Sequence, residues 1–340
     1  MTKYSFMDDY SEGCHPRILS ALTNTNLEQQ AAYGHDAYCV AAKALIHDHL
    51  DNKDASIFFV AGGTLANLIL IASLLRSHEA VIAPTSGHIV QRETGAIEAT
   101  GHKIISVKTD DGKMTPRHIT QTLDENAHAP HMAKPRLVYI SNATETGRIY
   151  TKSDLTALAK TCHTHGLLLM LDGARLSAAL TAKENDVTLK DLGALTDAFW
   201  LGGTKSGALI GEAIIINRPE LAVDFEFHIK QRGALLAKGR LLGLQFKTLF
   251  ETDLYFEAGL FANELAQKIS NGVLDKGYRL LNVTETNQVF PVLPNQLIET
   301  LQKRFGFYVW EKVDADHSAL RLVTSWATDP VQVAAFIDAL

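Results

Sequence analysis

The stretch that decides the fold is Leu167-Leu-Leu-Met-Leu171, an uninterrupted apolar run that ends in Asp172-Gly-Ala-Arg175. A second apolar run, Ala198-Phe-Trp-Leu201, follows later and ends in Gly202-Gly-Thr-Lys205. Such runs are typical of strands buried on both faces of a parallel sheet. Because parallel strands end at one edge, the two runs predict that a carboxylate and an amine lie together at that edge.

Segments typical of strands and of helices alternate along the chain from about residue 26 to residue 217. This alternation predicts an α/β fold in which a mostly parallel sheet is flanked by helices. The predicted strands are 56–60, 80–83, 103–107, 136–141, 167–171, 197–201 and 212–216, and the predicted helices are 65–76, 88–100, 115–124, 152–165 and 186–192.

After Arg218-Pro219 a long, mainly helical stretch precedes several short strands and a last helix, which predicts a smaller C-terminal α+β unit. A chain of 340 residues is long enough for both units. The mainly helical stretch is 235–269, broken by glycines, and a last helix begins at about Pro330. The expected strands are 288–292, 306–310 and 319–323, and the divisions are an N-terminal segment (1–25), a large domain (26–240) and a small domain (241–340).

Composition excludes several classes of protein. With 46% hydrophobic residues, 21% charged residues and a net charge of -6, the chain gives no electrostatic reason to expect nucleic acid or an anionic membrane as partner. The three cysteines, Cys14, Cys39 and Cys162, are odd in number and have no metal-ligand spacing, so we expect no disulfide framework and a cytoplasmic location. The N-terminus lacks the apolar core of a signal peptide.

Residues 55–75 carry no charge and are long enough to resemble a membrane helix. Gly62, Gly63 and Asn67 interrupt them, which favours a strand, a tight turn and a helix instead. The turn Gly62-Gly-Thr64 then offers free backbone N–H groups at a helix N-terminus, where a phosphate binds well. The alternative is a plain turn in which Thr64 caps the helix.

Asp172 and Lys205 are the two groups that pyridoxal phosphate (PLP) needs. A lysine forms a Schiff base with it, and a carboxylate keeps a proton on its pyridine nitrogen. The alternatives are a structural ion pair between Asp172 and Arg175 and a solvated loop lysine. We favour the cofactor because Asp172 ends a buried strand, where a carboxylate needs a cation, and because glycines before Lys205 let the backbone approach a ligand.

His88 follows the predicted strand 80–83, where an imidazole can stack on a pyridine ring; a helix-start histidine without a ligand is the alternative. Two histidine-rich stretches, His47-Asp-His-Leu-Asp51 and Cys162-His-Thr-His165, have an (i, i+2) spacing on predicted helices. That spacing places the side chains on different faces, so we expect no metal site.

Together these residues resemble the threonine aldolase family of PLP enzymes, which has the aspartate-aminotransferase-like fold. The matching features are Tyr33-Gly-His-Asp36, Gly63-Thr-Leu-Ala-Asn67, His88, Asp172-Gly-Ala-Arg175 and Lys205, in the family's order. The similarity covers about residues 30 to 325.

The resemblance implies a role for each matching residue. Lys205, His88 and Asp172 would be catalytic; Gly62, Gly63, Thr64, Arg175, Lys230 and Lys238 would also contact the cofactor; and Ser11, Arg175 and Arg321 would bind the substrate, an amino acid. Because Lys230 and Lys238 would act partly in a neighbouring subunit, it also implies a homodimer or homotetramer with shared active sites.

The chain departs from the family in two places. The family's Arg-Ser-Asp-Thr start reads Phe6-Met-Asp-Asp9 here, with only Ser11 nearby. The family's Glu-Asn-Thr-His-Asn-Gly loop reads Ser141-Asn-Ala-Thr-Glu-Thr-Gly147, so the histidine that contacts the substrate hydroxyl is missing. Thr144 and Glu145 are the candidates to replace it.

The leading hypothesis is retro-aldol cleavage of L-threonine or L-allo-threonine to glycine and acetaldehyde. The alternative is PLP-dependent β-elimination or racemisation of a related amino acid, which the missing histidine keeps open. A non-catalytic PLP-binding protein is disfavoured by the intact Asp172 and Lys205. A nicotinamide-dependent dehydrogenase fits the sheet but lacks the G-x-G-x-x-G fingerprint.

Overall fold

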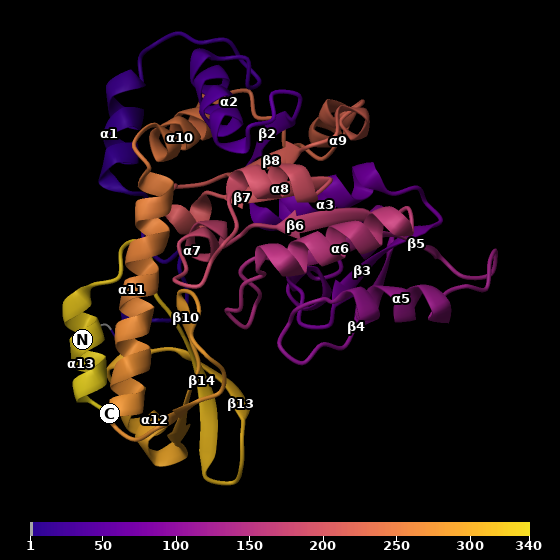
Figure 1. The fold of residues 1–340 in the computed structure, drawn as a ribbon. Coiled ribbons are helices and arrows are strands. Elements are labelled where there is room, and N and C mark those ends of the chain that lie inside the picture. The colour runs from indigo at the N-terminus through magenta and orange to yellow at the C-terminus, as the bar shows by residue number, and fades with distance from the viewer. Residues whose placement is uncertain (1–2) are drawn as a thin grey trace.

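A seven-stranded sheet forms the centre of the protein, in a computed structural model that describes residues 3–340 (Figure 1). The strand order is β2-β8-β7-β6-β5-β3-β4, and every neighbouring pair is parallel except those that involve β8. The mostly parallel sheet is therefore confirmed. Its strands are β2 (Ser56–Val60), β3 (Glu79–Pro84), β4 (Lys103–Val107), β5 (Lys134–Ser141), β6 (Leu168–Asp172), β7 (Ala198–Gly202) and β8 (Glu212–Ile216).

Helices cover both faces of this sheet because its central strands are apolar on both sides. β3, β6, β7 and β8 are buried along their whole length, whereas the edge strand β4 is partly exposed. One face packs against α3 (Gly63–Leu74), α4 (His88–Gln91) and α9 (Phe225–Gln231). The other packs against α2 (Ala37–Leu50), α5 (Pro116–Glu125), α6 (Lys152–Thr164), α7 (Leu176–Leu180), α8 (Leu189–Leu195) and α10 (Arg240–Glu251).

The C-terminal part is a separate α+β unit with its own apolar core, as predicted. The long helix α11 (Leu254–Asp275) runs from the large sheet down to this unit (Figure 1). An antiparallel sheet follows, covered by α12 (Asn295–Leu301) and α13 (Pro330–Asp338). Its strands are β9 (Arg279–Leu280), β10 (Gln288–Val289), β11 (Pro291–Pro294), β13 (Tyr308–Lys312) and β14 (His317–Val323).

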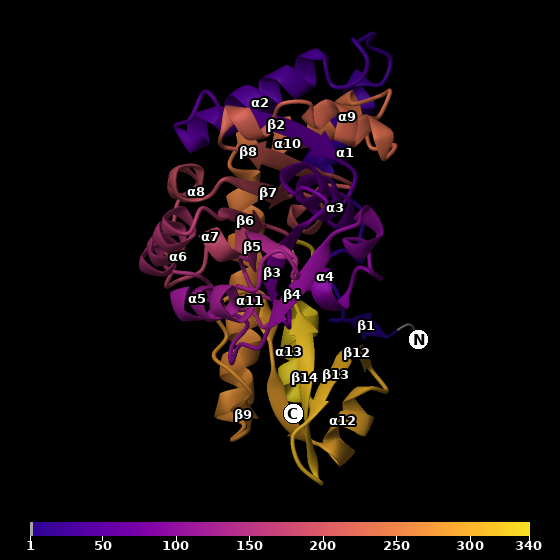
Figure 2. The same ribbon diagram turned by 90° about the vertical axis from the view of Figure 1, so that its right-hand side faces the viewer.

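The N-terminus of the described chain lies beside this C-terminal unit (Figure 2). Strand β1 (Tyr4–Ser5) pairs in parallel with β12 (Phe305–Gly306), and helix α1 (Pro16–Thr25) then packs against α10. The helix α10 also packs closely on α2, since a Cβ on Gly243 would lie 2.6 Å from the Cα of Cys39. The division at residues 25 and 240 stays a prediction.

One predicted element is wrong. The helix expected over 88–100 consists of the short α4 and a 3-10 turn at Glu98–Thr100. Between them Thr94 and Gly95 have positive φ values of 54° and 74°, which a right-handed helix cannot accommodate. Among the helices of residues 3–340, none is both long and apolar enough to cross a membrane.

Candidate active site

The carboxyl ends of the parallel strands open onto a cavity of about 310 Å³. A second cavity of about 400 Å³ adjoins it on the side of the C-terminal unit. The first is lined by seven predicted site residues, namely Gly62, Gly63, Thr64, His88, Asp172, Arg175 and Lys205, and the second by Arg321 together with His88, Arg175 and Lys205.

Three predicted residues lie elsewhere. Ser11 is exposed and lines neither cavity. Lys230 and Lys238 are also exposed, and the ammonium of Lys230 lies 4.8 Å from the ring centre of Tyr33. The structure therefore does not bring these three side chains to the cavities of their own chain.

Asp172 is the last residue of β6 and is 3% exposed. Its Oδ2 accepts hydrogen bonds from Asn67 Nδ2 (2.9 Å) and Tyr139 Oη (2.6 Å), and its Oδ1 accepts one from the N–H of Ala174 (3.0 Å). No cationic side chain of residues 3–340 lies within 4.0 Å of this carboxylate. The alternative ion pair with Arg175 is wrong, because Arg175 pairs with Asp9.

His88 begins α4 and is held by a second buried carboxylate. Its Nδ1 lies 2.8 Å from Glu93 Oε1, which also accepts a hydrogen bond from Asn67 Nδ2 (2.8 Å). Burial and the charge of Asp172 raise the pKa of Glu93. The amide of Asn67, fixed by Trp200 Nε1 (3.0 Å), therefore joins the His88 side of the cavity to the Asp172 side.

Lys205 lies in the turn after β7, and its amine makes no hydrogen bond or ion pair within the described residues 3–340. Burial and the nearby guanidinium of Arg175 lower its pKa. Glu212, the first residue of β8, accepts hydrogen bonds from the Gly203 N–H and the Thr204 hydroxyl (both 2.8 Å). Burial raises the pKa of Glu212 to about 7.

The Gly62-Gly-Thr64 turn opens helix α3, and Gly62 rather than Thr64 occupies the N-cap position. The first backbone bond of the helix runs from the Ala66 N–H to the Gly62 carbonyl. The N–H groups of Gly63, Thr64 and Leu65 consequently have no acceptor in the helix. The cap alternative for Thr64 is wrong, and Gly62, Gly63 and Thr64 line the first cavity.

The glycines around Asp172 and Lys205 serve the protein backbone. A Cβ on Gly173 would lie 1.9 Å from the Trp200 carbonyl oxygen, and one on Gly202 would lie 2.4 Å from the Ala174 oxygen. The expectation that Gly202 lets the backbone approach a ligand is therefore corrected: it lets the ends of β6 and β7 approach each other.

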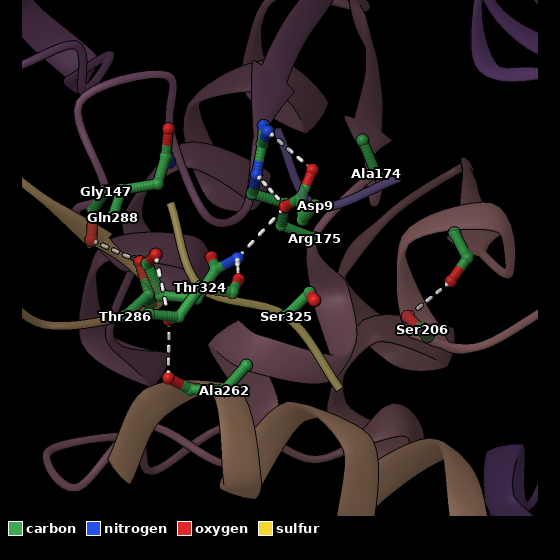
Figure 3. Close-up of polar contacts among 12 residues, drawn as sticks. Asp9, Gly147, Ala174, Arg175, Ser206, Ala262, Thr286, Gln288, Thr324 and Ser325 are labelled. Carbon is green, nitrogen blue, oxygen red and sulfur yellow. Dashed lines mark hydrogen bonds and ion pairs between the residues drawn. The ribbon is translucent and has the colours of Figure 1, made fainter. Parts of the chain in front are cut away.

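The two arginines expected to bind the substrate both have protein partners. Arg175 donates from Nε to Asp9 Oδ2 (2.7 Å) and from Nη2 to Asp9 Oδ1 (3.1 Å), as Figure 3 shows. Arg321 donates from Nε (3.0 Å) and Nη2 (2.8 Å) to Gln288 Oε1. Burial and the charge of Arg175 lower the pKa of Arg321 to about 10. Within residues 3–340, Nη1 of each arginine makes no hydrogen bond.

The two candidates in the loop after β5 differ in position. The Thr144 hydroxyl lies 3.0 Å from that of Thr146, accepts a bond from the Arg148 N–H (3.0 Å), and lines neither cavity. Glu145 lines both cavities. The structure therefore brings Glu145, and not Thr144, to the site.

Sequence reasoning missed several residues of the site. Glu93 and Tyr139 contact the predicted residues His88 and Asp172, Glu212 lines the first cavity, and Asp9 holds Arg175. Of these four missed residues, only Asp9 could have been found from the sequence, because it lies in the segment that corresponds to the polar Arg-Ser-Asp-Thr start of the family. Among residues 3–340, no cluster of three or more histidine, cysteine or acidic side chains is arranged to hold a metal ion.

Known proteins resemble this chain over nearly its whole length. A low-specificity L-threonine aldolase from a Pseudomonas species is 34% identical over 334 residues, which are 96% of this chain and 93% of that protein. The one from Pseudomonas aeruginosa is 33% identical over 329 residues, 95% and 92% of the two chains. The solved structure of a threonine aldolase from Leishmania major has a TM-score of 0.97 and 45% identity, covering 98% of both chains.

The fold is shared more widely. Aspartate aminotransferase from Thermus thermophilus has a TM-score of 0.72 at 14% identity, covering 99% of this chain and 90% of the other, which shows the predicted aspartate-aminotransferase-like fold. The model of the beta-eliminating lyase family matches residues 8–294. Since that match spans most of the sequence and the relatives above align with almost all of it, the chain belongs to the beta-eliminating lyase family, in its threonine aldolase group.

Proposed function

We propose that this protein is a PLP-dependent lyase that cleaves β-hydroxy-α-amino acids, such as L-threonine and L-allo-threonine, into glycine and an aldehyde. The observation that carries the proposal is the presence of Asp172 and Lys205 in one cavity at the edge of the sheet. The names of the similar proteins support threonine as the substrate.

The residues of the first cavity fit PLP. Asp172 is a buried carboxylate with three hydrogen-bond donors and no cation from residues 3–340, so a pyridinium N–H would supply the missing positive charge. Within residues 3–340 the amine of Lys205 makes no hydrogen bond or ion pair and lies only over the ring of Tyr10, and its pKa is lowered, as a nucleophilic lysine requires. The free N–H groups of Gly63 and Thr64 suit a phosphate.

Each side chain then has a distinct task. When bound, the cofactor withdraws the electron pair of the bond that breaks at the substrate's α-carbon. Lys205 would hold the cofactor covalently, Asp172 would keep the proton on its ring nitrogen, His88 would pack against the ring, and Gly62, Gly63 and Thr64 would bind its phosphate.

The substrate carboxylate binds between Arg175 and Arg321. Both side chains line the second cavity, and each retains an Nη1 group for a ligand. Asp9 and Gln288 hold the two guanidinium groups in place, so the carboxylate meets donors of fixed orientation. Held at its carboxylate in this way, the substrate would have a fixed orientation at Cα, which would favour breaking the Cα–Cβ bond over the others.

A covalent-trapping experiment tests the cofactor assignment. The purified protein should be yellow, and borohydride should fix the cofactor to the chain. The Lys205→Ala variant should show no fixation. A wild-type protein that binds no PLP, or a variant that is trapped as efficiently, would refute the assignment.

An aldehyde assay tests the reaction. L-threonine, L-allo-threonine, phenylserine and serine are supplied separately, and aldehyde is measured. The alternative is β-elimination or racemisation of a related amino acid, which the absence of a histidine from the loop 141–147 keeps open. No aldehyde from any of the four, with turnover to another product, would establish that alternative.

We further propose a homodimer or homotetramer in which Lys230 and Lys238 reach the active site of a neighbouring subunit. Large apolar side chains are exposed on or beside α1, α2 and α9, including Leu27 (94%), Phe227 (73%) and Val40 (60%). Such side chains favour burial against a second copy. Light scattering should give at least twice the mass of 37.2 kDa.

The cytoplasmic location stays a prediction.

A further inference from the structure

Glu145 has a buried carboxylate oxygen that no other group of residues 3–340 uses. Its Oε1 accepts hydrogen bonds from the Ser141 hydroxyl and from the His88 N–H, both at 2.9 Å. Its Oε2 is shielded from solvent and has no hydrogen-bond partner in residues 3–340. The side chain is thus fixed through one oxygen, and the other remains available.

The side chain that carries this oxygen borders both parts of the candidate site. Glu145 lines the cavity that contains Asp172 and also the cavity that contains Arg321. No cationic side chain of residues 3–340 lies within 4.0 Å of it. A buried carboxylate oxygen without a hydrogen-bond donor is unfavourable, so the hydroxyl group of a ligand would supply the missing donor.

The electrostatic environment suits a proton acceptor. Burial and the negative charge of Asp172 raise the pKa of Glu145. Once ionised, such a carboxylate is a stronger base than an exposed glutamate. His88 is a weaker candidate, because its Nδ1 is already paired with Glu93 and its ring is proposed above to pack against the cofactor.

We propose that Glu145 Oε2 accepts the proton of the substrate's β-hydroxyl group, an assignment that rests on the retro-aldol function proposed above. The electron pair of the O–H bond becomes the second bond of the aldehyde carbonyl. The Cα–Cβ bond breaks, and its electron pair remains with the glycine fragment. Glu145 later releases its proton while Cα takes one, so the reaction consumes no proton.

The test compares two reactions of the PLP-loaded Glu145→Gln variant. The amide oxygen of glutamine can still accept the bonds from Ser141 and His88, so the loop keeps its anchor. Cleavage of L-threonine, measured as acetaldehyde, should fall by about 100-fold or more. Exchange of the glycine α-proton in D2O, followed by NMR, should stay near the wild-type rate because glycine has no β-hydroxyl group.

Each outcome has a separate meaning. Equal threonine cleavage by wild type and Glu145→Gln, or equal losses of cleavage and glycine exchange, would overturn the role of Glu145. A wild-type protein that neither exchanges glycine nor releases aldehyde would instead overturn the proposed function. The exposed Glu299→Gln serves as the matched control, and both of its rates should equal those of the wild type.

Discussion

Buried carboxylates define the site at the scale of single residues. Asp172, Glu93, Glu145 and Glu212 all line or adjoin the first cavity, and burial raises the pKa of the three glutamates. Lys205 is the amine among them. Such a set of acids is unfavourable without a ligand, which agrees with a cationic ring binding in their midst.

Glu212 should set the pH at which Lys205 becomes reactive. Burial and Arg175 lower the pKa of Lys205, whereas the charge of Glu212 raises it. The Glu212→Gln variant removes that charge, so the amine should lose its proton at lower pH. The rate at which cofactor-free protein binds PLP covalently, followed by absorbance, should then reach its midpoint at lower pH. An unchanged or higher midpoint would contradict this coupling, and Glu251→Gln on the surface is the control.

Asp9 should stabilise the fold through its ion pair with Arg175. Burial opposes ionisation, but Arg175 and Lys205 hold the pKa of Asp9 below 3.8. Its stabilisation is therefore present above the unfolded-state pKa and is lost as pH falls through the folded-state value. Asp9→Asn should lower the free energy of unfolding by about 3 kcal/mol near neutral pH.

This loss should shrink below pH of about 4, where the wild type also loses the charge. Urea denaturation at several pH values measures both quantities. The exposed Glu12→Gln is the control, since it removes a nearby charge without a buried partner. If the free energies of unfolding of Asp9→Asn and the wild type differ by the same amount at every pH, the charge of Asp9 is not the cause of the difference.

At the scale of elements, strand direction decides which residues meet. Glu212 reaches the same edge as Asp172 because β8 runs antiparallel to its neighbours and begins where they end, with Glu212 opposite both Val60 and Gly202. Apolar runs predicted all seven strands of the large sheet. They carry no information on direction, so Glu212 could not be assigned to the site from sequence.

Helix α3 gives a prediction at this scale. A Cβ on Gly63 would lie 2.8 Å from Trp200 Cη2, and Trp200 fixes Asn67 beside Asp172. Gly63→Ala should therefore lower the free energy of unfolding by about 1–3 kcal/mol and weaken PLP binding. In Gly62→Ala the new Cβ meets nothing within 4 Å, and the backbone is extended there, so the loss of stability should be smaller. If urea denaturation shows that Gly63→Ala and Gly62→Ala lower the free energy of unfolding equally, the steric explanation is disproved.

The whole molecule assembles the site from three distant parts of the chain. Asn287 of the C-terminal unit donates a hydrogen bond to Asp9 Oδ2 (3.0 Å), and Asp9 holds Arg175 of the large domain (Figure 3). Motifs predicted the side chains that line the first cavity because each motif directly follows a strand of the sheet. The partners of Arg175 and Arg321 depend on contacts across the whole chain, which a local pattern does not contain.

The N-terminal segment should therefore couple folding of the C-terminal unit to substrate binding. Phe6 is fully buried, with its ring centre 5.9 Å from that of Phe305 and 5.6 Å from that of Phe336, and it anchors the segment that carries Asp9. Phe6→Ala should lower the free energy of unfolding by about 3–5 kcal/mol, since it leaves a cavity in this core.

Loss of this anchor should also affect binding. Because Asp9 positions Arg175, Phe6→Ala should raise the KM for L-threonine, while covalent PLP binding through Lys205 persists. Steady-state kinetics and cofactor absorbance separate the two effects, and Val331→Ala, at a side chain 68% exposed on α13, is the control. An unchanged KM in a destabilised Phe6→Ala protein would show that the segment stabilises the fold without holding the substrate site in place.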